Sequence, residues 1–400
     1  MKASSPVLML LPKAFQIPEF PRARLEAEVL LEAGYPVYVI AWDRNQEFPT
    51  LENVGGVVVR SIRFLNLSNF SRLGLAVGGI ALQVLLLFET LKLINQLKQR
   101  PIIHAHDVNT YLIGCLVRRL RLCGALIYDC REFTYGVYCE WFNAFVGSLV
   151  RVVEERCLRY ADAVVTVNDS IRAYLCRFNA ATETIYNCPR IKELPKISKK
   201  EARIRLCLAP HDLVVSFVGS IRYGCRFDLL LDAASATKEQ NINYIVVGDG
   251  PLAHELKLAV RRAGDLRVRI MPSVIREVAL LYVVASDLTW EVYGTGSRPT
   301  ANSRAGLSWK FLESLACGVP VIVERETVRA NLVRQFNCGL VLEGDDPNQV
   351  AQTILSLANH RDDLHRMSLE AKRAWERLDL NWESMSVRLL AIYERIRCPS

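Results

Sequence analysis

The feature that most constrains this chain is an alternation of short apolar runs, rich in Val and Ile, with longer amphipathic segments. Short runs of this kind are typical of buried strands, and strands that alternate with helices form parallel sheets covered on both faces. The sequence therefore predicts an α/β fold of two doubly wound domains in tandem. The expected strands are 7–11, 37–41, 57–60, 102–105, 125–129 and 163–167 in the first domain, and 213–218, 243–247, 267–270, 286–290, 320–323 and 339–342 in the second.

The domain boundaries follow from length and composition. A chain of 400 residues is long enough for two or three domains. Residues 189–200 include two prolines, five Lys or Arg and little apolar content, which is typical of a linker. We expect domains over 1–190 and 191–378, and a last helix from about Trp382, within 379–400, that crosses back to the first domain. Ligands of such sheets bind where the strands end, which predicts a site in the cleft between the domains.

Charge and cysteine content narrow the class of protein. The formal net charge is +8, shared equally by the two halves, and no basic tail or aromatic-basic pattern is present. Nucleic-acid binding is therefore disfavoured. The 12 cysteines are scattered without a C-x-x-C pair or zinc-finger spacing, so we expect a reduced, cytoplasmic protein without a metal or another cofactor.

An apolar stretch over 73–88 is unusual for a surface helix because it is hydrophobic on nearly all sides. It falls short of the ~20 residues that a spanning helix needs. It could be a core helix, or it could lie in a membrane interface, where flanking basic residues suit anionic lipids. The second interpretation predicts a peripheral protein on the inner face of the cytoplasmic membrane, with contacts from Arg63, Arg72, Leu86 and Phe88.

Two glycine-containing strings follow predicted strands of the second domain. In the first, Gly219 precedes Arg222 and Arg226, and a helix begins near Leu229. Glycine lets a backbone approach a phosphate, and arginine offers paired donors to it. The second string is Gly248-Asp249-Gly250. Either string could also be an ordinary turn with solvated side chains.

A third string runs from Ser308 to Ile322 and predicts a helix over about 309–317 that ends at Gly318. Lys310 and Glu313 are three residues apart and share a face of that helix. A cation there can meet a diphosphate, and a carboxylate can accept hydrogen bonds from a ribose diol. The alternative is a surface ion pair between the two.

Two histidines lie at the end of the predicted strand 102–105, His104 within it and His106 directly after it. We expect His104 and His106 to point to opposite faces, one of them into the core. His106, beside Asp107, is the one predicted to face the sugar or the acceptor. Arg131 could line the same site or pair with Asp107, and Glu132 could line it or cap the next helix.

These strings, in this order, resemble the donor half of glycosyltransferase family 4, which has the GT-B fold of two facing Rossmann-like domains. Further strings match the family along nearly the whole chain: 21–27, 103–107, 128–132, 161–164, 337–340 and 381–383. The resemblance implies that Arg222, Arg226 and Lys310 contact the donor diphosphate and that Glu313 contacts the ribose. It also implies that Gly219, Gly248, Asp249 and Gly250 shape the donor pocket, and that His106, Asp107, Arg131 and Glu132 line the catalytic, acceptor side.

The chain departs from the family pattern at two places. Many members have a pair of glutamates, of which the second matches Glu313 while the first falls on Ala305. The sequence is instead similar to a subgroup in which a lysine, here Lys310, precedes the glutamate by three residues. A histidine that is common in the family is replaced by Arg131.

The resemblance implies a retaining, metal-independent hexosyltransferase that uses a nucleotide-diphosphate sugar and a glycan or lipid-linked acceptor in polysaccharide or glycoconjugate synthesis. Arginine, lysine and helix N-termini can stabilise the departing phosphate without a metal. Ala305 leaves open a catalytically silent sugar-binding or scaffold protein of the same fold. An NAD-dependent oxidoreductase is disfavoured because no G-x-G-x-x-G string follows the first strand.

Overall fold

The computed structural model describes residues 5–17, 21–64, 72–264, 267–294 and 301–397. Its contacts divide the chain into two compact units, residues 1–186 with 385–400 and residues 187–384. The first boundary lies four residues before the predicted one at 190. Each unit has its own sheet, with strands in the order β3-β4-β2-β1-β5-β6-β7-β8 in the first and β11-β10-β9-β12-β13-β14 in the second. Two α/β domains of Rossmann type are therefore present, as predicted.

Among the described residues, every pairing of neighbouring strands in both sheets is parallel except that of β3 with β4. The central strands β1, β5 and β6 are buried along their whole length, which explains their uninterrupted apolar sequences. The strands of the first unit are β1 (Val7–Leu11), β2 (Val37–Trp42), β3 (Leu51–Val54), β4 (Val57–Ile62), β5 (Ile102–His106), β6 (Ala125–Cys130), β7 (Ala163–Thr166) and β8 (Thr182–Thr184).

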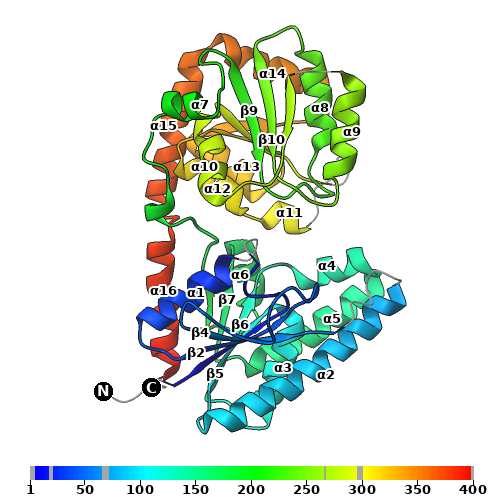
Figure 1. Cartoon of the computed structure of the whole chain (residues 1–400), viewed down its shortest axis with the longest axis vertical. Helices are drawn as coiled ribbons and strands as arrows, with labels where there is room; N and C mark the ends of the chain where they lie inside the picture. Colours follow the sequence, from blue (N-terminus) through cyan, green and yellow to red (C-terminus); the bar gives the residue numbers. More distant parts are fainter. Residues whose placement is uncertain (1–4, 18–20, 65–71, 265–266, 295–300, 398–400) are drawn as a thin grey trace. The chain divides into compact units, whose positions relative to one another are not determined.

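Helices cover both faces of the first sheet (Figure 1). Helices α2, α3 and α5 lie on one face, and α1 lies on the other with the second part of α16. The helices are α1 (Pro21–Glu32), α2 (Arg72–Leu97), α3 (Asp107–Arg119), α4 (Thr134–Trp141), α5 (Ala144–Cys157), the 3-10 helix η2 (Leu158–Tyr160), α6 (Asp169–Leu175) and α16 (Trp382–Arg397).

The second unit has the same alternation of strand and helix. Its strands are β9 (Leu213–Val218), β10 (Ile242–Val247), β11 (Val268–Met271), β12 (Leu288–Glu291), β13 (Val321–Glu324) and β14 (Gly339–Leu342). Its helices are η3 (Ile191–Glu193), α7 (Lys199–Arg205), α8 (Phe227–Ala236), α9 (Ala253–Ala263), α10 (Arg276–Ala285), α11 (Ala301–Ala305), α12 (Trp309–Ala316), α13 (Val328–Phe336), α14 (Pro347–Asn359) and α15 (Arg361–Arg377).

Helix α16 begins at Trp382 and carries the chain from the second unit into the first. Within the first unit, the Met385 sulfur accepts a hydrogen bond from the Tyr186 backbone N–H, and the Tyr393 hydroxyl lies 3.0 Å from Nδ1 of His104. The last helix is thus part of the core of the first unit.

Helix α2 is longer than the apolar stretch 73–88 indicated. It runs for 26 residues, and Gly78–Leu97 is long and apolar enough to cross a membrane by length and composition. The apolar stretch is therefore part of a longer helix, which continues through Glu89 and Lys92. Only 22% of its most apolar window is buried.

One side of α2 packs into the unit and another faces outward. Leu86 is 1% exposed and belongs to the main core of the unit. Its predicted role as a membrane contact is therefore wrong, since its side chain packs against the sheet. Ile80, Val84 and Phe88 are more than half exposed and form a stripe at helical spacing. Arg63 is exposed, and the side chain of Arg72 lies outside the described residues.

Candidate functional site

Two glycine loops pack against each other at the carboxyl ends of β9 and β10. The Gly219 N–H donates to the Val247 carbonyl over 2.8 Å. Gly248 has φ of 148°, and a Cβ built there would lie 1.9 Å from the Gly219 carbonyl oxygen. Gly250 is likewise constrained, since a Cβ there would lie 2.4 Å from the Ile221 carbonyl oxygen. These glycines are therefore required for loop-to-loop packing, a reason different from the close approach of a phosphate that the sequence suggested.

Lys310 lies in the first turn of α12 and reaches back over the end of β9. Its Nζ is 4.5 Å from the centre of the Phe217 ring and 5.2 Å from that of Tyr293. A Cβ on Gly219 would lie 2.6 Å from Lys310 Cδ, so the lysine stem packs on the glycine. Burial lowers the pKa of Lys310, and the nearby charge of Arg222 lowers this pKa further. An anion at this edge would restore the charged form.

Glu313 is anchored through one of its two oxygens. Oε1 accepts hydrogen bonds from Trp309 Nε1 at 2.5 Å and pairs with Arg276 Nη1 at 2.6 Å. Burial raises the pKa of Glu313, while the charge of Arg276 acts to lower it. Oε2 makes no hydrogen bond with a residue that the structure describes. The carboxylate is thus held in place with one acceptor left for a ligand.

The predicted alternative of an ion pair between Lys310 and Glu313 is not what the structure shows. Glu313 pairs with Arg276, and no ion pair joins it to Lys310 within the described ranges. The two side chains diverge from the start of α12, where Ser308 Oγ caps the helix by accepting from the Phe311 N–H over 3.0 Å.

The two predicted arginines differ in their surroundings. Arg222 is exposed and lies close enough to Lys310 to influence its titration. Arg226 instead pairs with Asp228 at 2.9 Å and with Asp345 at 3.2 Å. The charge of Arg226 is therefore offset by carboxylates. Of the two predicted arginines, the structure places Arg222 near Lys310. Asp249 is exposed and bonds the Gly250 N–H.

The carboxyl edge of the second sheet holds further charged residues that the sequence analysis missed. Glu291 ends β12, is 2% exposed, and accepts from Tyr293 at 2.9 Å and from Ser308 at 2.6 Å. Its charge acts to raise the pKa of Lys310. Glu324 ends β13 and pairs with Arg329 at 2.6 Å. Each of these two glutamates directly follows a predicted strand in the sequence, and that position was the signal that could have identified them.

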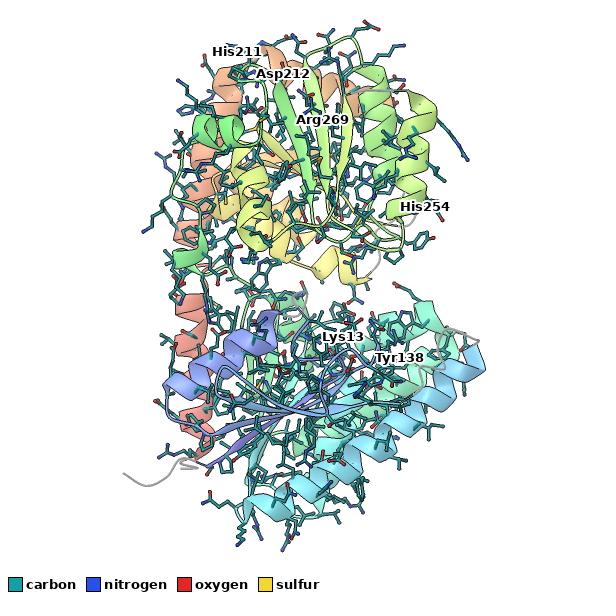
Figure 2. All side chains as sticks on the ribbon, viewed as in Figure 1. Lys13, Tyr138, His211, Asp212, His254 and Arg269 are labelled. Carbon is teal, nitrogen blue, oxygen red and sulfur yellow. The ribbon has the colours of Figure 1, made fainter. Side chains whose placement is uncertain are left out.

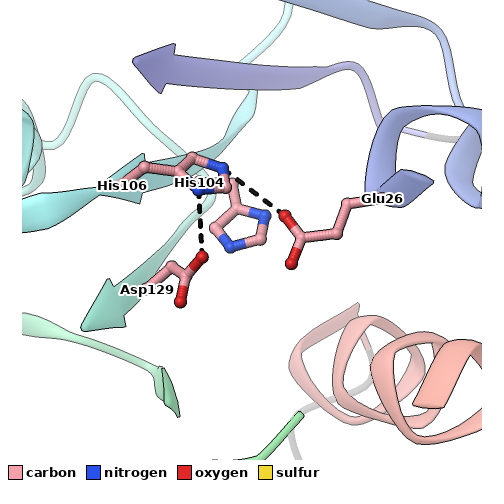
Figure 3. A group of neighbouring side chains, drawn as sticks. All are labelled: Glu26, His104, His106 and Asp129. Atoms are coloured by element: carbon pink, nitrogen blue, oxygen red, sulfur yellow. Dashed lines mark ion pairs between the residues drawn. The ribbon is translucent and has the colours of Figure 1, made fainter. Parts of the chain in front are cut away.

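In the first unit, His104 and His106 lie in β5 on the same face of the sheet, stacked with their ring centres 4.5 Å apart. The prediction of opposite faces is wrong because residues two apart in a strand share a face. Both side chains are fully buried with Glu26 of α1 and Asp129 of β6 (Figure 3). His106 Nδ1 is 3.0 Å from Asp129 Oδ2, and His106 Nε2 is 3.6 Å from Glu26 Oε2.

His106 therefore belongs to a buried network rather than to a surface that a sugar could contact directly, which corrects its predicted role. Asp107, the next residue, is at the surface. It has a φ of 67°, rare for a residue other than glycine, and its carboxylate pairs with Arg131 Nη2 at 2.6 Å. The alternative of an ion pair between Arg131 and Asp107 is thus the one observed.

Glu132 is exposed beside this pair, and it does not cap α4, whose N-cap is Phe133. Lys13, labelled in Figure 2, is also exposed and follows β1 at the same carboxyl edge. Tyr138 donates a hydrogen bond to Asn109 Oδ1 over 2.8 Å. Asp107, Arg131, Glu132 and Lys13 therefore provide polar groups of both signs at this edge.

Four residues of the buried network could in principle ligate a metal, since one donor atom from each of Glu26, His104, His106 and Asp129 lies within 4.8 Å of the others. A guanidinium already supplies positive charge there. Arg22 Nε is 2.9 Å from Glu26 and 3.0 Å from Asp129. We therefore interpret the group as an ionic network and assign no metal to it.

The titration of the network is consistent with that interpretation. Burial acts to raise the pKa of Asp129, but the charge of Arg22 and a hydrogen bond from His106 hold it well below its usual range. Burial raises the pKa of Glu26 and lowers that of His104. Arg22 and Glu26 lie in the family-like string 21–27, but nothing in the local sequence indicates that α1 faces β5 and β6.

Comparison with known families assigns a domain type to each unit. Residues 21–187 match the family described as glycosyl transferase 4-like domain, and residues 212–360 match the family described as glycosyl transferases group 1. The chain therefore combines the two domain types of a GT-B glycosyltransferase. The resemblance to glycosyltransferases is confirmed at this level.

The curated relatives are distant. The D-inositol 3-phosphate glycosyltransferase of Rhodococcus jostii is 29% identical over 199 residues, 48% of this chain and 42% of the relative. The alignment thus covers less than half of that protein. A GDP-mannose-dependent alpha-(1-6)-phosphatidylinositol monomannoside mannosyltransferase of Mycobacterium tuberculosis is 26% identical over 309 residues, 73% of this chain and 77% of the relative.

Solved structures show the same fold. Sucrose-phosphate synthase of Thermosynechococcus elongatus superposes with a TM-score of 0.77 at 17% identity, covering 99% of this chain and all of that one. Anabaena Alr3699/HepE, solved in complex with UDP and glucose, gives 0.71 at 15% identity, covering 98% of this chain and 100% of that one. At such identities the likeness establishes the GT-B fold and nothing more specific.

Proposed function

We propose that this chain is a retaining hexosyltransferase that moves a sugar from a nucleotide diphosphate to a glycan or lipid-linked acceptor. The observation that carries the proposal is the start of α12, where a half-buried lysine and a singly anchored glutamate lie beside a glycine loop. Buried groups with perturbed pKa at the carboxyl end of strands are typical of functional sites.

In the proposed reaction, the bond between the sugar C1 and the diphosphate oxygen breaks and negative charge grows on the phosphates. Lys310 and Arg222 meet this charge, so no metal is required. Glu313 Oε2 accepts from the ribose hydroxyls and fixes the nucleotide. The acceptor oxygen bonds to C1 on the face that the diphosphate leaves, and its proton passes to the departing phosphate. This route retains the configuration without a protein nucleophile.

For the acceptor, we propose the carboxyl edge of the first sheet. Asp107 and Arg131 form a pair that is partly exposed, with side chains 34% and 16% accessible. Hydroxyl and phosphate groups can bond to such a pair, and Lys13 and Glu132 lie at the same edge. The inositol-phosphate and phosphatidylinositol substrates in the names of two relatives support an acceptor of this polarity.

We propose further that the protein acts as a peripheral protein at an anionic membrane surface on the cytoplasmic side, in the synthesis of polysaccharide or glycoconjugate. Ile80, Val84 and Phe88 of α2 offer an exposed apolar stripe, and Arg63 and Lys92 are exposed basic residues. Because other positions of α2 are in the core of the unit, the proposal is surface contact rather than spanning.

A screen of UDP-, GDP-, ADP- and dTDP-sugars by thermal shift tests the donor assignment. We expect one nucleotide sugar to raise Tm, to be hydrolysed slowly, and to lose both effects in Glu313→Ala. Lys257→Ala, an exposed position on α9, is the control and should behave as wild type. Binding without turnover, unaffected by Glu313→Ala, would instead favour the catalytically silent alternative, and no binding would exclude the donor site.

A further inference from the structure

The first unit has a cavity at the amino edge of its sheet, opposite the edge that holds Asp107 and Arg131. Strands β5, β6 and β7 are parallel and start at Ile102, Ala125 and Ala163. The cavity has a volume of about 560 Å³ and lies among the segments that lead into these strands. Its charged lining residues are Arg100, Arg118, Arg119, Arg121, Arg159 and Asp162.

Most of the positive charge in this cavity has no protein partner. Arg118 is engaged, since it donates to Asp162 Oδ1 at 2.7 Å and to the Gly124 carbonyl at 2.9 Å. The other four arginines are exposed, and within the described ranges none of them forms an ion pair. With five guanidinium groups and one carboxylate, the lining has a formal charge of +4.

Basic residues are common at helix C-termini because they offset the helix dipole. That accounts for Arg118 and Arg119, which end α3. The same holds for Arg159, in the last turn of η2, and for Arg100, three residues after the end of α2, but it does not remove the repulsion between guanidinium groups that line one cavity. Like charges gathered from three segments repel one another, and a bound anion removes that cost.

We propose that this cavity is a second anion site, which binds a phosphate group carried by a small molecule or a lipid headgroup. Guanidinium groups match phosphate oxygens through paired hydrogen bonds, and several of them around one cavity favour a doubly charged group. Arg159 is steadied by the ring of Tyr160, whose centre is 5.2 Å from its Cζ. The site is separate from the proposed acceptor groups, since it lies at the other end of the strands.

Calorimetric titration with pyrophosphate tests the site in solution. The full chain with Lys310→Met serves as the parent protein, so that the proposed donor site contributes little to the measured pyrophosphate binding. The cavity variant adds Arg119→Gln, Arg121→Gln and Arg159→Gln, and leaves Arg118 in its structural pairs. We expect the Kd of the parent to rise about 100-fold or more in this variant, because three charge-assisted contacts are lost.

A matched variant controls for net charge. Arg261→Gln, Arg262→Gln and Arg269→Gln remove the same charge from exposed positions of the second unit, where Figure 2 labels Arg269. Binding should stay within twofold of the parent. Both triple variants should keep the Tm of the parent, since all six side chains are exposed.

A second experiment distinguishes a lipid headgroup from a soluble phosphate. Flotation with phosphatidylcholine vesicles, with and without phosphatidic acid, is measured for the same proteins. A lipid-borne phosphate is supported by two results together. Pyrophosphate should bind weakly, and flotation should need phosphatidic acid and be lost only in the cavity variant. The proposal is overturned if neither probe binds, or if the cavity and matched variants lose binding equally. These outcomes leave the donor assignment untouched, because nucleotide-sugar binding is scored separately.

Discussion

The carboxyl edges of the two sheets hold their charges in different ways. In the first unit, Arg22, Glu26, His106 and Asp129 form a buried network of ion pairs. In the second, Lys310 is half-buried against two aromatic rings, with no anion bonded to it in the described part of the chain. A buried ion-pair network fixes a scaffold, whereas a cation with no bonded anion costs stability and is retained where a ligand supplies the missing charge.

The largest change in stability is expected when the buried ion-pair network of the first unit loses its arginine. Arg22→Met leaves Glu26 and Asp129 buried without their cation, which should lower the free energy of unfolding of the first unit by about 3–5 kcal/mol. Urea denaturation followed by circular dichroism measures it. Arg24→Met, at a partly exposed position of the same helix, is the control and should change it by less than about 0.5 kcal/mol. Equal losses in both variants would contradict a special role for the network.

The second unit should respond in the opposite sense. Lys310→Met removes a desolvated charge, so stability should stay the same or rise, while transfer from the donor should fall about 100-fold or more. A steady-state assay with the donor found by the screen, alongside thermal unfolding, measures both. Lys257→Met should leave both at the wild-type level. If activity remains within threefold of wild type, Lys310 does not stabilise the departing phosphates.

The fold was predictable because the buried strands have continuous apolar sequences, as 213–218 and 339–342 show with matching bounds. Strands β3 and β8 were missed because they are short and partly polar, at the rims of the sheet. In the site, Lys310 and Glu313 could be found because both lie in one helical turn. Arg276, which anchors Glu313, could not, since it comes from α10 and only tertiary packing brings the two together.

The histidines show where sequence reasoning failed. His106 follows a predicted strand in a pattern that suggests a ligand-facing group. The charges around it, however, come from Glu26 of α1 and from Asp129 of β6, which lie far from it in the sequence. Which residues share a buried cluster is decided by the packing of α1 and α16 on the sheet. Local sequence does not encode that.

The closed network also predicts a pH dependence. His104 has a folded pKa well below its unfolded value of about 6.5, because burial disfavours the charged ring. Between these two values the unfolded chain binds more protons, so stability should fall as the pH drops below about 6.5. The slope attributable to His104 is at most about 1.4 kcal/mol per pH unit.

Free energies of unfolding measured at pH 7.5 and 5.5 check this prediction. His104→Gln should reduce the difference between the two values, whatever it does to stability at pH 7.5. His254→Gln, at an exposed position labelled in Figure 2, should leave the difference unchanged. The same difference in His104→Gln as in wild type would show that His104 titrates normally.

The smallest effect concerns the link from α16 to the network. Tyr393→Phe removes the hydroxyl that lies 3.0 Å from His104 Nδ1, and should lower the free energy of unfolding of the first unit by about 1 kcal/mol. Urea denaturation measures it, with Tyr223→Phe, an exposed hydroxyl, as the control. Because the hydroxyl touches the closed network and not the second unit, the KM for the donor should stay at its wild-type value. A changed KM with unchanged stability would mean that a change in the network of the first unit reaches the donor site through α16. The contrast between a closed scaffold and a ligand-dependent site would then no longer hold.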